Sequence, residues 1–294
     1  MKTLINIWMT MRPWQWTKNV VIFVPIIFAQ KAYNTTLLVH ALFAFVLFCG
    51  ASSCIYIAND LLDRDNDRIH PVKGRRPIAS GDLAPGIAVS VLVVMLVAVV
   101  ALSFCVNQKF GLTLMGYVVL NLAYSAVLKH YVIIDVMTIA LGFVLRVMAG
   151  AVAVGVPASS WLFLCTILLA LFLGFGKRRH ELVLLDTQAH AHRAILQEYS
   201  PYYLDQMIAV VTASTVVAYS LYAISPEVEK KLGTPYLYLT IPFVLYGIFR
   251  YLYLIHQKEK GGSPSSLLFN DKPLLINIVL WAATAVMILY PVRS

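Results

Sequence analysis

The chain has 294 residues, of which 60% are hydrophobic and only 13% are charged, and its mean hydropathy is +0.77. Soluble domains carry about 25% charged residues, so this composition excludes a soluble fold of this length. The apolar runs are long and continuous, which favours membrane-spanning helices over the short alternating segments of a barrel. No basic stripe interleaved with polar surface lies outside the short loops, so the formal net charge of +9 indicates membrane orientation and excludes a nucleic-acid partner.

About nine segments of the sequence are long and apolar enough to cross a bilayer as helices. They lie at approximately 19–33, 37–58, 84–106, 110–128, 133–154, 159–176, 205–224, 235–255 and 273–291. The first contains Pro25, and the amphipathic, Trp-rich residues 4–16 before it are expected to lie in the membrane interface. These segments predict an all-α polytopic membrane bundle that forms a single domain over residues 1–294.

Lysine and arginine residues are about three times as frequent in the connecting segments on one side of the expected bundle as on the other. Because cytoplasmic loops collect these residues, we expect the N-terminus inside and the C-terminus outside the cytoplasmic (inner) membrane. Two long loops, at about 59–83 and 177–204, then lie on the cytoplasmic side, where an active site is expected. Arg12, Pro13 and Lys18 interrupt the N-terminal segment, so no signal peptide is expected.

The cysteines and histidines show no pattern typical of a metal site or a disulfide framework. The four cysteines lie in apolar runs without CxxC spacing, namely Cys49, Cys54, Cys105 and Cys165. His190 and His192 are two residues apart and would point to different sides of a helix.

The strongest local signal is an acidic stretch, Asn59-Asp60-Leu-Leu-Asp63-Arg-Asp65-Asn-Asp67, directly after the second apolar segment. Asp60, Asp63 and Asp67 recur at spacings of three and four, so a helix places them on one face. Three carboxylates repel one another unless a cation neutralises them, and Mg²⁺, with Mn²⁺ as an alternative, bridges carboxylate and phosphate oxygens. A solvated acidic loop is the other interpretation, and Asp65 is expected to point to the surface.

Basic residues follow the acidic stretch closely. Lys73 and Arg76 lie near the carboxylates and are interpreted as phosphate contacts, because ammonium and guanidinium groups bind phosphate well. Arg75 is equally well explained by the positive charge of cytoplasmic loops. Acids and an excess of cations at one membrane face suit a metal-bound diphosphate with further phosphates, and access from the lipid would admit an isoprenoid chain.

Arg146 lies inside the expected span 133–154, where a charge is costly and by default functional. The alternatives are a side chain that reaches toward the membrane surface, or one that pairs with an acid to hold helices together. Asp135 lies about three helical turns earlier and could equally be a structural partner of Lys129.

The sixth span ends in three consecutive cations, Lys177-Arg178-Arg179. Such a run can serve only to orient the chain in the membrane, or Lys177 and Arg178 can contact a ligand. Lys18 and Asn19 begin the first span at the same cytoplasmic side.

Five motifs in order make the chain similar to the UbiA superfamily of intramembrane prenyltransferases, and within it to the decaprenyl-phosphate phosphoribosyltransferase branch. The matching stretches are Arg12-Pro13-x-Gln15-Trp16-x-Lys18-Asn19, NDxxDxxxD at 59–67 with His70-Pro71-x-Lys73-x-x-Arg76-Pro77, Tyr124-Ser125-x-x-Leu128-Lys129, Leu145-Arg146-x-x-Ala149-Gly150, and Gly176-Lys177-Arg178-x-x-Glu181-Leu182, with Arg193 and Tyr199 beyond them. The usual members carry a second acidic motif of DxxxD type after the fourth helix, where this sequence has a lysine and one acid.

The resemblance implies a nine-helix transferase in which polyprenyl phosphate attacks C1 of 5-phosphoribosyl-1-diphosphate with inversion, giving a β-linked phosphoribosyl lipid for cell-wall or glycoconjugate synthesis. Asp60, Asp63 and Asp67 would bind Mg²⁺ on the diphosphate, and Lys129 would stand in place of the second acidic motif. Implied substrate contacts are Lys18, Asn19, Asn59, Lys73, Arg76, Tyr124, Asp135, Arg146, Lys177, Arg178, Glu181 and Arg193. Membrane lipids are expected neighbours, and an oligomer is compatible with the sequence.

Two other functions share some of these features. An ordinary UbiA prenyltransferase would use a prenyl diphosphate and an aromatic or glycerol-phosphate acceptor, and it differs at the second acidic motif. A lipid transporter would also place charges within spans, but transporters often carry internal repeats, and the sequence shows no clear repeat.

Overall fold

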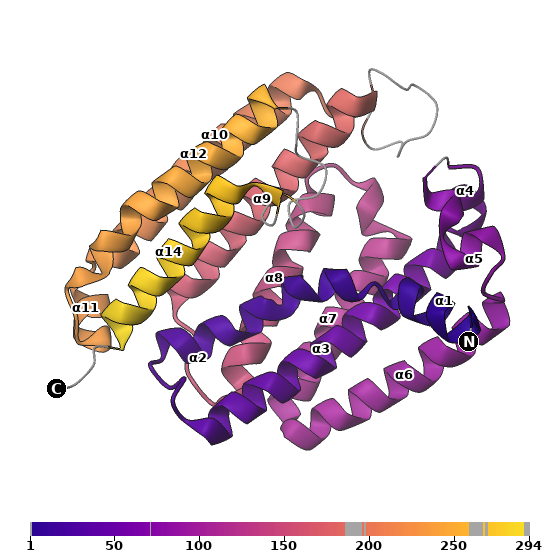
Figure 1. Cartoon of the computed structure of the whole chain (residues 1–294), viewed down its shortest axis with the longest axis horizontal. Coiled ribbons are helices and arrows are strands. Elements are labelled where there is room, and N and C mark those ends of the chain that lie inside the picture. The colour runs from indigo at the N-terminus through magenta and orange to yellow at the C-terminus, as the bar shows by residue number, and fades with distance from the viewer. Residues whose placement is uncertain are drawn as a thin grey trace. The chain divides into compact units, whose positions relative to one another are not determined.

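The computed structural model describes residues 2–70, 72–185, 196, 198–258, 267 and 270–290. All regular elements within these residues are helices, so the expected all-α class is confirmed (Figure 1). The chain divides into two compact units. The first comprises Met1–Pro25, Asn34–Thr138 and Leu145–Pro157, and the second comprises Ile26–Tyr33, Ile139–Val144 and Ala158–Ser294.

Seven helical segments among the described residues are long and apolar enough to cross a membrane. They are α3 (Thr35–Leu62), α6 (Pro85–Val106), α8 (Ile134–Ala153), α9 (Ser160–Leu185), α10 (Pro201–Ile224), the continuous η5 (Tyr236–Thr240) and α12 (Ile241–Gln257), and α14 (Lys272–Leu289). The expected span 110–128 corresponds to the more polar α7 (Gln108–Ala126). The number of nine spans is therefore not confirmed.

The first expected span, 19–33, is not one helix. Residues Pro13–Phe23 form a 3₁₀ helix, η1, and α2 (Val24–Phe28) follows it. Pro13 occupies the first turn of η1, where its missing N–H leaves no helical hydrogen bond unmade. A 3₁₀ helix of 11 residues is much longer than the usual three or four, so tertiary packing must hold this segment.

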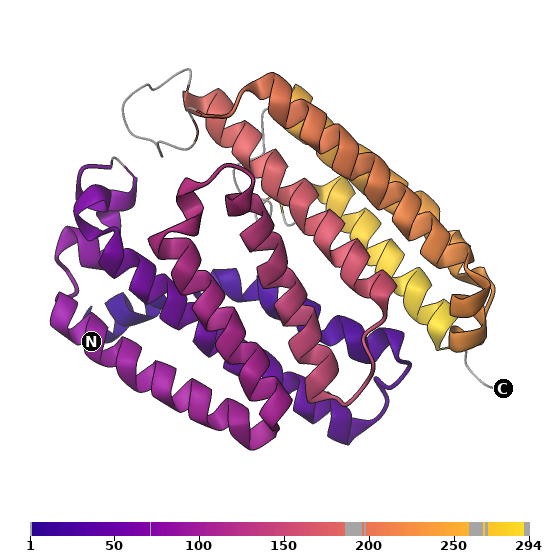
Figure 2. The same cartoon turned by 180° about the vertical axis from the view of Figure 1, so that it is seen from behind.

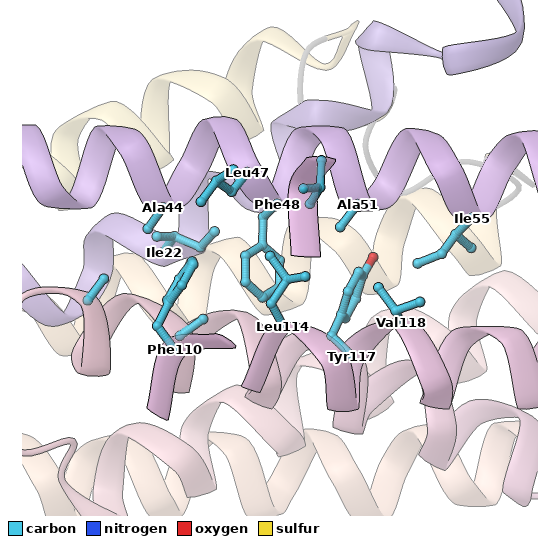
Figure 3. Packing of buried hydrophobic residues seen from close by; sticks show 13 residues of the cluster. Ile22, Ala44, Leu47, Phe48, Ala51, Ile55, Phe110, Leu114, Tyr117 and Val118 are labelled. Atoms are coloured by element: carbon cyan, nitrogen blue, oxygen red, sulfur yellow. The ribbon is translucent and has the colours of Figure 1, made fainter. Parts of the chain in front are cut away.

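The core of the first unit forms where α3 packs against α7, η1 and α6. Figure 3 shows Phe48 of α3 pointing toward α7, with its ring centroid 6.1 Å from that of Phe110 and 5.0 Å from that of Tyr117. Most of the apolar stretch of α3 is buried, whereas only 11% of the apolar stretch of α6 is buried. Helix α6 is therefore suited to a lipid environment, because it is strongly apolar and the described residues bury little of it.

The connection that follows α3 in the first unit folds into short helices against the ends of longer ones. After α3 come α4 (Arg64–Arg68), η2 (Lys73–Arg75) and α5 (Pro77–Ser80). Helix α5 also contacts α1 (Lys2–Met11), which packs on α3. The connection after the acidic motif therefore packs next to the N-terminal helix.

In the second unit α10 packs against both α9 and α12, and α12 packs against α14. These helices can be followed from behind in Figure 2. Tyr219 lies in its core, where the hydroxyl group is 2.7 Å from Thr240 Oγ1 and accepts a 3.0 Å hydrogen bond from Trp281. The segment Ile26–Tyr33 joins this unit through hydrogen bonds, including one of 2.6 Å from Gln30 to the Leu232 carbonyl oxygen.

Candidate active site

The acidic motif spans a break between two helices. Helix α3 ends at Leu62, Asp63 has φ −91° and ψ 6°, and α4 begins at Arg64. Asp60 and Asp67 are buried, whereas the Asp63 side chain remains 31% exposed. The backbone N–H groups of Asp63 and Asp67 nevertheless donate to the carbonyl oxygens four residues earlier, at 2.9 and 2.8 Å, so the helical spacing continues through the break. The expectation that a helix places all three carboxylates on one face stays a prediction. Asp65 is exposed, as predicted.

Arg76 joins the two buried carboxylates. Its Nη1 atom lies 3.1 Å from Asp60 Oδ1 and 2.5 Å from Asp67 Oδ2. The residue precedes Pro77 and has extended backbone angles, as a following proline requires, and this conformation places it at the start of α5. A single guanidinium nitrogen therefore marks the point where Asp60 and Asp67 converge.

Arg12 also contacts Asp60, although the sequence interpretation assigned it no role in the site. Its Nη2 atom forms an ion pair with Asp60 Oδ1, and its guanidinium carbon lies 5.0 Å from the centroid of the Tyr56 ring. The backbone of Arg12 is left-handed, with φ 53° and ψ 61°, at the junction of α1 and η1. Its place in the motif beside Pro13 was the available signal, but spacing along the chain could not reveal a contact 48 residues away.

Lys129 pairs with the remaining carboxylate of the acidic motif. It lies in η3 (Leu128–His130), and its Nζ atom is 2.8 Å from Asp63 Oδ1. This lysine, which stands where the usual members of the UbiA superfamily carry a second acidic motif, therefore neutralises part of the first motif. Asp135 lies fully buried in the first turn of α8.

The fit of a magnesium ion can be tested on these atoms. Among the described residues, no three His, Cys, Asp or Glu side chains gather closely enough to hold a metal. Mg²⁺ needs only one or two protein carboxylates, with water and phosphate oxygens completing its octahedron. Asp60 and Asp67 converge at Arg76, and the buried Asn59 Oδ1 atom has no hydrogen-bond partner among the described residues. The donor set thus fits a magnesium ion held by two carboxylates.

Arg146 is buried in a polar network inside the first unit. Its Nε atom donates to Asn19 Oδ1 at 2.8 Å, and its Nη2 atom donates to the Tyr117 hydroxyl oxygen at 2.7 Å. The Tyr117 hydroxyl group also lies 3.2 Å from Ser52 Oγ. Arg146 is 7% exposed, so the alternative in which its side chain reaches toward the membrane surface is wrong.

Three further predicted contacts of the first unit are half-buried. Lys18 lies on η1, Lys73 on η2 and Tyr124 on α7. Burial, together with the nearby Arg146 and Arg12 guanidiniums, lowers the pKa of the Lys18 ammonium group to about 8. Lys18 therefore lies in a cationic environment that would favour an anion.

The second unit holds the remaining predicted contacts on and after α9. Arg178 is fully buried and donates to Glu181 Oε2 at 2.5 Å, whereas Lys177 is partly exposed and lies 3.6 Å from Glu181 Oε1. Arg179 forms an ion pair with Asp205, in keeping with its place outside the matched motifs. Arg193 lies outside the described residues.

Comparison with known sequences decides the family. A sequence model described as the UbiA prenyltransferase family matches residues 20–277. The chain belongs to this family. Two curated relatives are each called decaprenyl-phosphate phosphoribosyltransferase. The one from Corynebacterium glutamicum is 32% identical over 95% of this chain and 85% of its own length, and the one from Mycolicibacterium smegmatis is 32% identical over 93% and 89%.

A solved structure of a UbiA homologue has the same fold over nearly all of this chain. A UbiA homologue from Archaeoglobus fulgidus, bound to GPP and Mg²⁺, superimposes with a TM-score of 0.72. The match covers 97% of this chain and 99% of the other at 19% identity. This likeness confirms the fold. The family match, together with the seven apolar segments among the described residues, identifies an integral membrane protein.

Proposed function

We propose that this UbiA family protein transfers 5-phosphoribose from 5-phosphoribosyl-1-diphosphate to a polyprenyl phosphate and releases diphosphate. The observation that carries the proposal is the ion pair between Lys129 and Asp63. A lysine at this place leaves no second acidic motif for a second metal-bound diphosphate, and a lipid monophosphate needs none. The names of the relatives from Corynebacterium glutamicum and Mycolicibacterium smegmatis support the same reaction.

The chemistry needs little proton transfer. A phosphate monoester has a second pKa near 6, so the lipid phosphate is already a nucleophilic oxyanion at about pH 7. Its oxygen attacks C1 of the ribose, the bond from C1 to the diphosphate breaks, and the diphosphate leaves with the electron pair. Direct displacement inverts C1 and gives the β-linked product from the α-diphosphate. The protein must therefore hold two anions together and stabilise the leaving charge.

The acidic motif and its arginine serve the diphosphate. Asp60 and Asp67 would hold Mg²⁺ or Mn²⁺, with Asp63 as the third predicted ligand and Asn59 orienting them. The metal, when bound, neutralises the charge that develops on the leaving diphosphate. Lys73 and Arg76 would neutralise the rest of that charge.

The other predicted contacts divide the ribose 5-phosphate and the lipid phosphate between them. In the first unit Lys18 and Arg146 would bind these groups, with Asn19, Tyr124 and Asp135 beside them. From the second unit the predicted contacts are Lys177, Arg178, Glu181 and Arg193. The burial of Arg146 and Arg178 supports a role in anion binding, because the attraction between a cation and an anion is stronger where the dielectric constant is low.

The proposed location is the cytoplasmic (inner) membrane, with the N-terminus inside and the active site at the cytoplasmic face. The distribution of lysine and arginine supports this orientation. Membrane lipids then surround the bundle, and the polyprenyl phosphate enters the active site from the bilayer.

Purified protein with radiolabelled donor and polyprenyl phosphate tests the function. We expect a labelled phosphoribosyl lipid that requires Mg²⁺ and disappears with a chelator. Asp60→Asn and Asp67→Asn are expected to lower turnover at least about 100-fold, because they remove charge from the metal position. Asp65→Asn is the matched control, since this exposed aspartate should leave turnover unchanged. Near-normal turnover in both Asp60→Asn and Asp67→Asn would contradict the metal assignment.

A prenyl-diphosphate-dependent reaction on an aromatic or glycerol-phosphate acceptor is the second candidate. The family name and the GPP-bound homologue from Archaeoglobus fulgidus favour it. Lys129→Ala separates the two. If Lys129 marks the phosphoribosyl reaction, this change lowers its rate, and an unchanged rate and donor affinity would remove that explanation.

A further inference from the structure

The three carboxylates of the acidic motif meet three cations in the first unit. Asp60 contacts Arg12 and Arg76, Asp67 contacts Arg76, and Asp63 contacts Lys129. The formal charges of these six side chains cancel. Arg76 lies where Asp60 and Asp67 converge, so it occupies the position that suits a metal ion between them.

Arg12 is built into this cluster by the backbone around it. The Met11 carbonyl oxygen accepts a 3.1 Å hydrogen bond from Ser53 on α3, and Trp16 donates a 3.0 Å hydrogen bond to the same serine. Both contacts hold the junction between α1 and η1 against α3. The left-handed conformation of Arg12 is unusual for a residue other than glycine, and the hydrogen bonds to Ser53 on either side of it hold the backbone in place.

The face of α3 that holds this junction leads directly to the motif. Ser53, Tyr56 and Asp60 are spaced by three and four residues, so they lie along one side of the helix. Arg12 lies over the Tyr56 ring and reaches Asp60 at the end of that row. Its side chain is 18% exposed, so it is not fully enclosed by protein.

A metal ion and the two guanidiniums compete for the same carboxylate oxygens. A magnesium ion held by Asp60 and Asp67 would replace Arg76 as their shared partner, and it would take from Arg12 the negative charge that Arg12 neutralises. Two displaced guanidiniums beside a dication repel one another unless an anion joins them. A diphosphate group provides that anion, because guanidinium groups bind phosphate oxygens in a fork geometry.

We propose that Arg12 is a further diphosphate-binding residue, which exchanges its carboxylate partner for the diphosphate, together with Arg76, when the metal binds. Metal and diphosphate then raise each other's affinity, since each removes a cost of binding the other. The inference deepens the proposed function, because it rests on a donor that carries a diphosphate group. In this proposal Arg12 binds the diphosphate group, and it does not serve only to hold α1 in place.

Mn²⁺ and inorganic diphosphate are the probes that test this exchange. Isothermal titration of the purified full chain measures Mn²⁺ affinity with and without diphosphate. We expect diphosphate to tighten Mn²⁺ binding about tenfold or more. In Arg12→Gln, Mn²⁺ alone should bind several-fold more tightly than in the wild type, because a competing cation is gone. Diphosphate in the presence of Mn²⁺ should bind about tenfold more weakly.

The opposite signs of these two changes distinguish ligand binding from a structural role. A damaged fold would weaken both ligands, and that result in a thermally stable Arg12→Gln protein would overturn the inference. Arg12→Lys keeps the positive charge but loses the guanidinium fork, so it should keep the wild-type Mn²⁺ affinity within about threefold and bind diphosphate more weakly than the wild type but more tightly than Arg12→Gln. Arg75→Gln, an exposed arginine next to Arg76, is the matched control and should change neither affinity.

The same titrations separate this inference from the proposed function. Coupled Mn²⁺ and diphosphate binding without phosphoribosyl transfer would support the role of Arg12 and reject the proposed donor. Transfer of phosphoribose with independent binding of Mn²⁺ and diphosphate would support the proposed function and reject the exchange.

Discussion

At the scale of single residues, the charge of Lys18 in the first unit changes at a pH just above neutrality. Burial and two neighbouring guanidiniums lower the pKa of Lys18 to about 8. Lys18 is therefore charged below this value and becomes neutral as the pH rises through it. The phosphate groups of the substrates change little in this range, because their second pKa is near 6.

Substrate affinity should follow the charge of Lys18. If this ammonium group binds a phosphate, affinity stays level between about pH 7 and 7.5 and falls by up to about tenfold per unit above pH 8. Lys18→Arg keeps its charge over this range and should give a level profile. Apparent donor and lipid affinities measured from pH 7 to 9.5 check this, and the same decline in Lys18→Arg would exclude Lys18 as its cause.

The residue types of the site were largely predictable, but their pairing was not. The spacing of Asp60, Asp63 and Asp67 identified the acidic motif, and its nearness in sequence identified Arg76. The contact between Lys129 and Asp63 joins residues 66 positions apart. Such contacts depend on how helices pack, and the sequence pattern does not contain that information for a single chain.

At the scale of elements, η1 and α8 cross so closely that one glycine is required. A Cβ atom on Gly150 would overlap the backbone carbonyl group of Ile22, which is fully buried. Asn19 lies three residues before Ile22, and Arg146 lies four residues before Gly150. The crossing therefore brings the Asn19 amide oxygen to the Arg146 guanidinium.

Gly150→Ala should separate the two helices and weaken this hydrogen bond. We expect a loss of about 1–3 kcal/mol in the free energy of unfolding, as for other overpacked core positions, and reduced turnover. Gly116→Ala on α7 is the matched control, since its Cβ atom would meet no other atom within 4 Å. Thermal unfolding in detergent measures both variants, and an unchanged midpoint for Gly150→Ala would contradict the close crossing.

Helices with long, nearly continuous apolar sequences were predictable, but the first expected span was not. The expected span 37–58 became α3, because nearly all its residues are apolar. The expected span 19–33 forms η1 and α2 instead. Pro25 lies inside that span and has no N–H to donate to the Val21 carbonyl oxygen, so one continuous α-helix would leave that hydrogen bond unmade. Apolar content alone could not show this change of helix type.

At the scale of the whole molecule, the distribution of cations predicts the orientation in the membrane. Arg75 and Lys109 are exposed and lie in connections expected on opposite sides. In a background without the four native cysteines, Lys109→Cys should react with a membrane-impermeant maleimide in intact cells. Arg75→Cys should react only after the membrane is opened, and the reverse pattern would place the N-terminus outside.

The choice of donor tests the central claim most directly. Purified protein receives equal concentrations of 5-phosphoribosyl-1-diphosphate and a prenyl diphosphate, with polyprenyl phosphate, an aromatic acceptor and glycerol phosphate present, in Mg²⁺. Mass spectrometry of the extracted lipids identifies the product. We predict a polyprenyl phosphate that has gained one phosphoribosyl group. A prenylated aromatic or glycerol-phosphate product, with no phosphoribosyl lipid, would contradict the proposed function.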